Sequence, residues 1–545
     1  MRTLFRRNLP GHLARAVLLL LSISLLGGTA VCAQHPQEKV DLEAINRIKD
    51  EEAHRSQIME MVGYLTDVTG PRLTGSPNIK KAQEYARERL KEWGIANARL
   101  EAWGPFGRGW SLEDFTASMT APTFSPLIAY PRAWSPGTNG AVRGEVVFID
   151  AKTAADLDKY KGRLKGKIVL LSPAQPVAPN FQPQASRTSD EELLRLADAE
   201  PTAEAQRFQM TPEQRASADL NYRKWELAYA EDAAVVLTPG RGDAGTVYVM
   251  SAIIPSPVAV PFEKRLQPWD ISKPKLIPQA VMAAEQYNRI VRLLGRGIRV
   301  ELQVNIKARF YDEDPMSYNV IGEMPGTDLK DEVVMIGGCI DSWHAGTGAT
   351  DNAAGAAVAL EVIRIIKTLG LRPRRTIRIG LWSAEEQGRL GSRAYVAAHF
   401  GRRADEASGV STRARFEPMP EYEKFAGYFN LDYGTGKIRG IYLQGNEAVR
   451  PIFRAWLAPF KDLGATTLSI ADIGATDHVS FDEVGLPGFQ FIRDFMESNT
   501  RTGHTNMDVY DHALEDDLKQ SAVVATSLIY HAAMRDEKLP RKPLH

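Results

Sequence analysis

The stretch VVMIGGCIDSWHAGTGATDNAAGAAVALEVIRII, residues 333–366, predicts how the C-terminal half of this chain folds. Its first six residues are apolar or glycine, which indicates a buried strand. A polar loop follows, and the alanine-rich segment after that loop is typical of a helix buried on several sides. A strand that passes through a glycine-rich turn into a helix is the unit from which parallel α/β sheets are built.

The same alternation of strand and helix continues along the chain. The further strands are RTIRIGLWSAEE (375–386), KFAGYFNLDYG (424–434) and LPGFQFI (486–492), and the further helices are 390–400, 448–464 and 517–534. Because strands alternate with helices, we predict an α/β fold with a mostly parallel central sheet that is flanked by helices.

A β-rich domain is predicted to interrupt this α/β domain. Four short β-like runs separated by turn residues indicate it: GEVVFID (144–150), GKIVLLS (166–172), DAAVVLTPG (232–240) and GTVYVMSAI (245–253). A polar helical segment lies between the second and third runs. We therefore assign residues 34–121 and 279–545 to the main domain, and residues 122–278 to an inserted domain.

The N-terminus has the features of a signal peptide, predicted to span residues 1–33. Arginines precede an apolar run at 16–26, which is short for a membrane span, and small residues follow at 31–33. Cleavage there predicts an exported protein, periplasmic or secreted, that is not held in the membrane. Cleavage would also remove Cys32 and leave Cys339 as the single cysteine, so no internal disulfide is expected.

Composition and missing motifs exclude several classes of function. The chain has 67 basic and 67 acidic residues, so no strong positive field indicates a nucleic-acid partner. The sequence contains no G-x-S-x-G nucleophile motif, no phosphate-binding P-loop, no dinucleotide-binding glycine fingerprint and no H-E-x-x-H zinc motif.

Residues of the types that commonly bind metals or transfer protons follow the predicted strands. They are Cys339, Asp341 and Asp351 after the first strand, Glu385 and Glu386 after the second, Asp432 after the third, and His504 in a late loop. In open α/β sheets, ligands bind outside the carboxyl ends of the strands. Asp351 alone could be a helix cap and Asp432 alone a turn residue, but neither interpretation explains the whole set.

Four segments in this order resemble the co-catalytic zinc exopeptidases of the aminopeptidase and glutamate-carboxypeptidase type, in particular the plasma glutamate carboxypeptidase branch. The segments are GGCIDSW with GATDNAAG, LWSAEEQG, NLDYGTG and GHTNMD. The inserted region resembles a protease-associated domain through GKIVLL and AAVVL. The resemblance implies an exported zinc exopeptidase that hydrolyses terminal bonds of short peptides, and homodimers occur among such enzymes.

The resemblance also implies roles for individual residues. Asp351 would bridge two zinc ions, with Cys339 and Asp432 completing the first site and Glu386 and His504 the second. Glu385 would be the general base for the attacking water, Asp341 would lie behind the first metal, and His478 in TDHVSF would help to hold the oxyanion.

Cys339 departs from the family pattern, which has histidine at this position. A thiolate is a good zinc ligand, so the site can still hold its ion. Two alternatives to a two-zinc peptidase stay open: a glutaminyl cyclase, which needs one zinc, and a binding protein with a degraded first site. Aminopeptidase, carboxypeptidase and dipeptidase activities are not distinguished by any motif.

Overall fold

The computed structural model describes residues 38–201, 210–403 and 416–542. The predicted signal peptide, residues 1–33, lies outside these ranges. Within them, no helix combines the length and the apolar character that a membrane span requires. Residues 40–545 belong to one compact unit.

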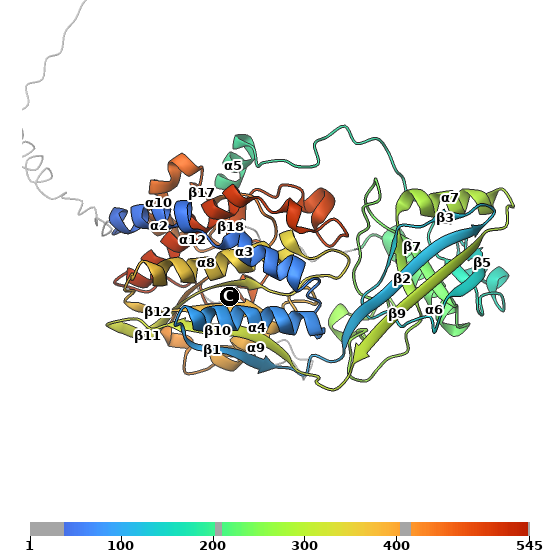
Figure 1. The fold of residues 1–545 in the computed structure, drawn as a ribbon, viewed down its shortest axis with the longest axis horizontal. Coiled ribbons are helices and arrows are strands. Elements are labelled where there is room, and N and C mark those ends of the chain that lie inside the picture. The colour runs from blue at the N-terminus through green and yellow to red at the C-terminus, as the bar shows by residue number, and fades with distance from the viewer. Residues whose placement is uncertain (1–37, 202–209, 404–415, 543–545) are drawn as a thin grey trace, which may run out of the picture. The chain divides into compact units, whose positions relative to one another are not determined.

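The first of two large sheets contains the strands predicted from the sequence (Figure 1). Its order is β1 (Ala96–Trp103), β10 (Ser317–Met324), β12 (Arg375–Trp382), β11 (Leu329–Cys339), β15 (Phe425–Asn430), β18 (Gly488–Arg493), β16 (Ile438–Tyr442), β17 (Thr467–Ser469). The four central strands β12, β11, β15 and β18 run parallel, whereas β10 and β16 pair antiparallel to this core. The predicted parallel arrangement therefore holds for the centre of the sheet.

Both faces of this sheet are covered, as its apolar strands require. Alternate residues of β11 enter different cores: Val334 and Ile336 pack in one cluster, and Val333 and Met335 in another. The first cluster also takes residues from α2 (Leu42–Arg55), α4 (Pro77–Glu92), α8 (Ala354–Thr368) and α12 (Glu515–Met534), and the second from α9 (Leu390–His399) and α11 (His478–Asp482). The predicted α/β architecture with flanking helices is confirmed.

The second sheet is larger than the predicted inserted domain. Its order is β3 (Ser125–Pro126), β2 (Gly109–Ala121), β9 (Glu301–Tyr311), β5 (Val142–Phe148), β6 (Ile168–Leu170), β7 (Val235–Pro239), β8 (Gln279–Met282), β4 (Ala129–Pro131). The long antiparallel pair of β2 and β9 lies outside the predicted limits of 122 and 278. The strands of this sheet therefore run from residue 109 to residue 311.

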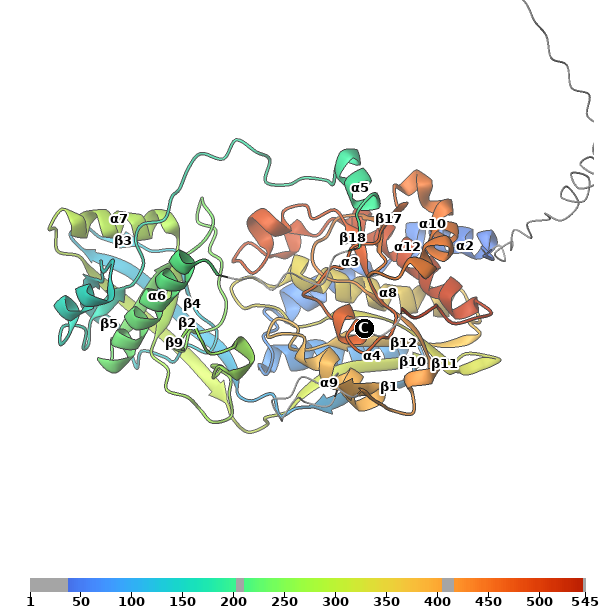
Figure 2. The ribbon, with the colours of Figure 1, turned by 180° about the vertical axis from the view of Figure 1, so that it is seen from behind.

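Two helices cover the second sheet (Figure 2). Trp225 and Ala228 of α6 (Pro212–Ala230) pack in one core with Val236 of β7, while Tyr287 and Ile290 of α7 (Ala284–Gly295) pack in another. Helices therefore pack on the second sheet as well, although the sequence indicates its strands only as short β-like runs.

One part of the inserted segment packs against the first sheet instead. Helix α5 (Asp190–Ala197) contacts β17, and the preceding Arg187 lies 2.7 Å from Asp517 of α12 and 3.1 Å from Asp494. Asp494 and Asp517 are buried, and Arg187 supplies their counter-charge together with Arg439, which lies 3.1 Å from Asp494.

A partly buried charge cluster joins three elements at the edge of the first sheet. His399, at the end of α9, places one ring nitrogen 2.6 Å from Glu101 of β1 and the other 3.0 Å from Glu421. Burial opposes the charged imidazole, but hydrogen bonds and charges from Glu101 and Glu421 outweigh it and raise the pKa of His399 to about 9.

Replacing His399 with glutamine should remove a pH-dependent contribution to stability. The folded pKa lies above the ordinary value of 6.5, so the contribution is complete below about pH 6.5 and is lost as the pH rises through about 9. We expect the wild type to exceed His399→Gln by about 1–2 kcal/mol in free energy of unfolding near pH 6, and by much less near pH 10. Guanidinium titrations at both pH values measure this difference.

The matched control is His54→Gln. His54 also faces an aspartate, at 3.1 Å, but its side chain is 67% exposed, so solvent screens the pair and little change is expected. A stability difference between the wild type and His399→Gln that does not vary with pH would contradict the prediction.

Candidate metal centre

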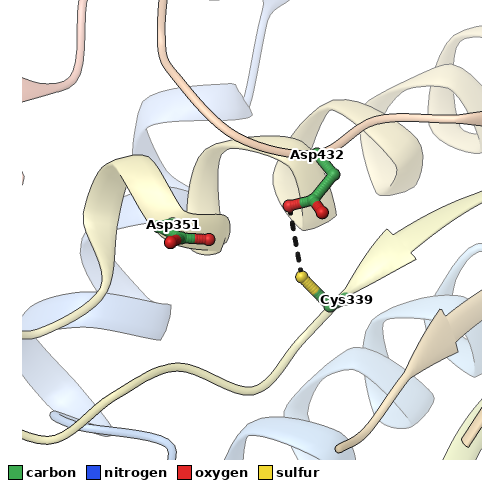
Figure 3. A group of neighbouring side chains, drawn as sticks. All are labelled: Cys339, Asp351 and Asp432. Atoms are coloured by element: carbon green, nitrogen blue, oxygen red, sulfur yellow. Dashed lines mark hydrogen bonds between the residues drawn. The ribbon is translucent and has the colours of Figure 1, made fainter. Parts of the chain in front are cut away.

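Two groups of possible metal ligands meet at Asp351. Within each group, Cys339 with Asp351 and Asp432, and Asp351 with Glu386 and His504, one ligand atom per residue lies within 4.8 Å of the others. Figure 3 shows the first group, in which the Cys339 thiol donates to an Asp432 oxygen at 3.4 Å. In the second group, Nε2 of His504 lies 3.1 Å from both carboxylates. The structure therefore brings together all five predicted ligands.

The parallel strands explain why these residues meet. Cys339 is the last residue of β11, Asp432 follows β15 by two residues, and Glu386 follows β12 by four. Because β12, β11 and β15 are neighbours and run parallel, their carboxyl ends lie at one edge of the sheet. The loop after β18 adds His504 to this edge.

The adjacent glutamates both reach the cleft because the chain leaves the strand before them. Ala384 has φ of +56°, a left-handed conformation that breaks the alternation of the strand. The backbone N–H groups of Glu385 and Glu386 then donate to the Asp341 carboxylate at 3.2 and 3.3 Å. Thr74 donates to the same carboxylate at 3.1 Å, so Asp341 holds the turn that aims both glutamates.

Asp351 is held in a similar way by a residue that the sequence analysis did not single out. Asp508 accepts the backbone N–H groups of Thr350 at 2.6 Å and Asp351 at 3.2 Å. Asp508 is the last residue of the GHTNMD segment, so its place beside His504 in the sequence was the available signal.

Hydrogen bonds link the chain at the ends of β11 and β15, close to the candidate ligands. The Asn352 side-chain amide donates to the Cys339 carbonyl at 3.2 Å and to the Leu431 carbonyl at 2.9 Å. Gly355 is needed at the start of α8, because a Cβ there would lie 2.3 Å from the Leu431 carbonyl oxygen. These contacts fix the spacing between Cys339 and Asp432.

Arg72 organises the loop that leads to Asp351. It is fully buried, and its guanidinium donates to the carbonyls of Ile340, Thr347 and Gly348 at 2.8, 2.6 and 2.7 Å. Its positive charge also lies near Asp508. No motif marks this residue in the sequence, because its partners lie some 270 residues away.

Burial makes the carboxylate cluster costly to ionise. Burial, with a further contribution from Asp351, raises the pKa of Asp432 to about 6 and that of Glu386 to about 8. Burial likewise raises the pKa of Glu385 and of the Cys339 thiol well above their usual values, and Asp432 adds to both effects.

This chemistry fits a divalent metal ion. One Glu386 oxygen, Oε1, is buried without a hydrogen-bond partner among the described residues. Crowded carboxylates, an imidazole and a thiol offer oxygen, nitrogen and sulfur donors, which is the donor set that zinc accepts. A bound cation would offset the repulsion and favour the ionised ligands.

The structure does not bring His478 into the cleft. It is buried at the start of α11, with Nε2 2.9 Å from the Ile473 carbonyl, and it is not among the residues that line the cleft. The charge of the preceding Asp477 contributes to the raised pKa of Glu385.

A cleft opens over the two ligand groups. Its volume is about 520 Å³, and Glu385, Asp432 and His504 line it together with the apolar side chains of Phe491 and Phe495. Glu385 faces this cleft but belongs to neither ligand group. A proton-transfer group therefore stands beside the candidate metal positions.

The second sheet domain contributes to the centre through Tyr248. Its hydroxyl lies 3.1 Å from Nδ1 of His504, the nitrogen directed away from the ligand group. The backbone N–H of Val249 donates to the His504 carbonyl at 2.9 Å, so the two loops are joined. The sequence predicted only a strand at Tyr248 and gave no sign of this contact.

Comparison with known proteins agrees with this geometry. Residues 319–529 match the sequence profile described as Peptidase family M28. Carboxypeptidase Q of Mus musculus is 25% identical over 493 residues, covering 90% of this chain and 88% of that protein.

Solved structures share the fold. The peptidase M28 precursor from Shewanella amazonensis aligns with a TM-score of 0.64 at 23% identity, covering 92% of this chain and 99% of that chain. The Bacillus subtilis zinc aminopeptidase BSAP aligns with a TM-score of 0.52 at 19% identity, covering 88% and 95%. Together, the profile match and the relative of similar length identify this chain as a metallopeptidase whose residues 319–529 are similar to peptidase family M28, and the solved structures share its fold.

Proposed function

We propose that this protein is an exported exopeptidase that uses two zinc ions to hydrolyse a terminal bond of a short peptide. The observation that carries the proposal is the sharing of Asp351 by two ligand groups. Cys339, Asp351 and Asp432 would hold the first ion, and Asp351, Glu386 and His504 the second. Export rests on the N-terminal sequence features.

The candidate ligands and Glu385 have separate roles in the proposed hydrolysis. When bound, the two ions would supply Lewis acidity to the scissile carbonyl and lower the pKa of a water molecule. Glu385 takes the proton from the attacking water, because it faces the cleft without serving as a ligand. Its raised pKa suits it to keep that proton and deliver it to the amine as the carbon–nitrogen bond breaks.

The orientation of His504 supports its role as a ligand. Its Nε2 points at Asp351 and Glu386, so Nδ1 carries the proton of the neutral ring and donates to the Tyr248 oxygen. A hydrogen bond of this kind fixes both the tautomer and the ring plane. Tyr248 is thus a positioning residue supplied by the second sheet domain.

Cys339 changes the character of the first position. A thiolate raises the formal charge of the five ligands together from three negatives to four, and it donates electrons more strongly than an imidazole. The first ion would therefore be a weaker Lewis acid than one held by histidine. Asp341 makes no hydrogen bond to the thiol and instead accepts from the Glu385–Glu386 turn.

Elemental analysis of reduced protein should find about two zinc ions per chain. We expect Cys339→Ser to retain about one, because a hydroxyl is a much weaker zinc ligand than a thiolate, while Cys339→His retains two. Cobalt substitution provides a spectroscopic measurement, in which a sulfur-to-cobalt charge-transfer band should be present in the wild type and absent from both variants. Protein that binds no zinc after zinc is added back would refute the proposal.

Replacing Glu385 with glutamine should abolish catalysis without removing metal. We expect a loss in kcat of roughly 10²- to 10⁴-fold, because the amide cannot accept the proton from water. Peptide hydrolysis and zinc content are measured on the same preparation. Glu423→Gln, at an exposed surface carboxylate, is the control and should leave both unchanged. Full activity in Glu385→Gln would rule out the mechanism.

A further inference from the structure

The two carboxylate oxygens of Asp432 have different partners. Oδ1 accepts a hydrogen bond from the Cys339 thiol at 3.4 Å, as Figure 3 shows, and Oδ2 accepts one from the Thr476 hydroxyl. Oδ1 therefore faces the first ligand group, while Oδ2 is held by Thr476. The Thr476 hydroxyl is in turn the last member of a chain of buried polar side chains.

Asn430 lies at the centre of this chain. It is the last residue of β15, two positions before Asp432, and its side chain is fully buried. Its amide nitrogen donates to Thr476 Oγ1 and to Gln490 Oε1, both at 2.8 Å. Its amide oxygen accepts from the Tyr428 hydroxyl at 2.5 Å. Both N–H groups of the amide and its oxygen thus have partners.

The direction of each hydrogen bond is set at both ends of the chain. The Trp382 indole, which can only donate, gives its N–H to the Tyr428 hydroxyl at 2.7 Å, so the hydroxyl proton points at Asn430. The Gln490 amide nitrogen donates to the Asp432 backbone carbonyl at 3.0 Å, so the Gln490 oxygen faces Asn430. The Asn430 amide can therefore satisfy both neighbours in one orientation only.

This orientation determines where the Thr476 proton lies. Thr476 Oγ1 accepts from the Asn430 amide and from the backbone N–H of Asp477, at 2.7 Å, which takes both lone pairs of the hydroxyl. The hydroxyl proton is left to point at Asp432 Oδ2. A carboxylate whose second oxygen is bonded in this way is fixed in its plane and offers its first oxygen to an ion.

Asn430 is separated from the space that a substrate would occupy. Neither Asn430 nor its partner Tyr428 is among the described residues that line the cleft, whereas Thr476 and Gln490 are. Asn430 and Tyr428 are fully buried, so solvent does not replace a hydrogen-bond partner that is removed. Asn430 therefore acts on the centre through Thr476, Gln490 and Asp432.

We propose that Asn430 is a positioning residue for the first metal position. Through Thr476 it fixes the Asp432 carboxylate, and through Gln490 it fixes the Asp432 backbone. Oδ1 is thereby held toward Cys339. This inference rests on the two-ion centre of the proposed function and deepens it, because it assigns the side chain that prepares one half of that centre for its ion.

Cobalt titration of the metal-free protein tests this assignment. The sulfur-to-cobalt charge-transfer band reports the first position, because Cys339 belongs to that ligand group and no other cysteine is among the described residues. Asn430→Leu keeps a branched side chain and removes its polar atoms. We expect it to raise the dissociation constant measured from this band roughly 10- to 100-fold, the usual effect of losing a group that orients a metal ligand.

The matched control is Asn288→Leu. Asn288 is also a buried asparagine, and its amide bonds to the backbone of Gln175 in the second sheet domain at 2.7 and 2.8 Å. The control removes a similar pair of buried hydrogen bonds that have no link to Asp432, so the dissociation constant should stay at the wild-type value.

Thr476 supplies a second pair of variants in case Asn430→Leu does not fold. Thr476→Val keeps the shape of the side chain and removes the hydroxyl, so the dissociation constant should rise in the same range. Thr476→Ser keeps the hydroxyl and should bind cobalt as the wild type does. Folded Asn430→Leu or Thr476→Val protein with the wild-type constant would overturn the inference.

Peptide hydrolysis by the same preparations separates this inference from the proposed function. If the wild type hydrolyses peptides and the variants keep the wild-type constant, the function stands and the role of Asn430 fails. If the variants raise the constant but the wild type hydrolyses no peptide, the role of Asn430 stands and the proposed function fails. A wild type without the charge-transfer band would overturn the inference together with the two-ion centre.

Discussion

Repulsion between buried acidic groups is the constraint that shapes the centre of this protein. Carboxylates and a thiol meet at the carboxyl ends of three parallel strands, where burial raises the pKa of Asp432, Glu386 and Cys339. The surrounding structure offsets this repulsion with hydrogen-bond donors. Backbone N–H groups point at Asp341 and Asp508, and Arg72 braces the loop before Asp351. A bound cation would offset this repulsion and favour the ionised ligands.

The cysteine is consistent with this arrangement. Burial raises the pKa of the Cys339 thiol, which would therefore be inert without a metal. A bound zinc ion, by contrast, deprotonates a coordinating thiol outright. Full burial of Cys339 also shields the sulfur from oxidants. In the proposed centre, a thiolate in place of a neutral imidazole would make the first ion a weaker Lewis acid.

The two sheet domains have different tasks. Strand ends of the first sheet hold the ligands and Glu385, and the second sheet domain adds Tyr248 beside His504. The candidate ligands therefore come from the first sheet and its loops, whereas the orientation of His504 also depends on the second sheet.

The sequence by itself predicted the α/β class, the central parallel strands of the first sheet and candidate residues at their carboxyl ends, because hydrophobic patterns and strand-end positions are local signals. The grouping of these residues into two ligand sets followed from the family resemblance. Only the tertiary structure decided which residues meet across long separations. Tyr248 contacts His504 from 256 residues away, and β2 pairs with β9 across the whole inserted segment. Likewise, the packing of α11 decided that His478 bonds to the Ile473 carbonyl and that the charge of Asp477 acts on Glu385. Pairing and helix orientation depend on packing between distant segments, and no local pattern encodes them.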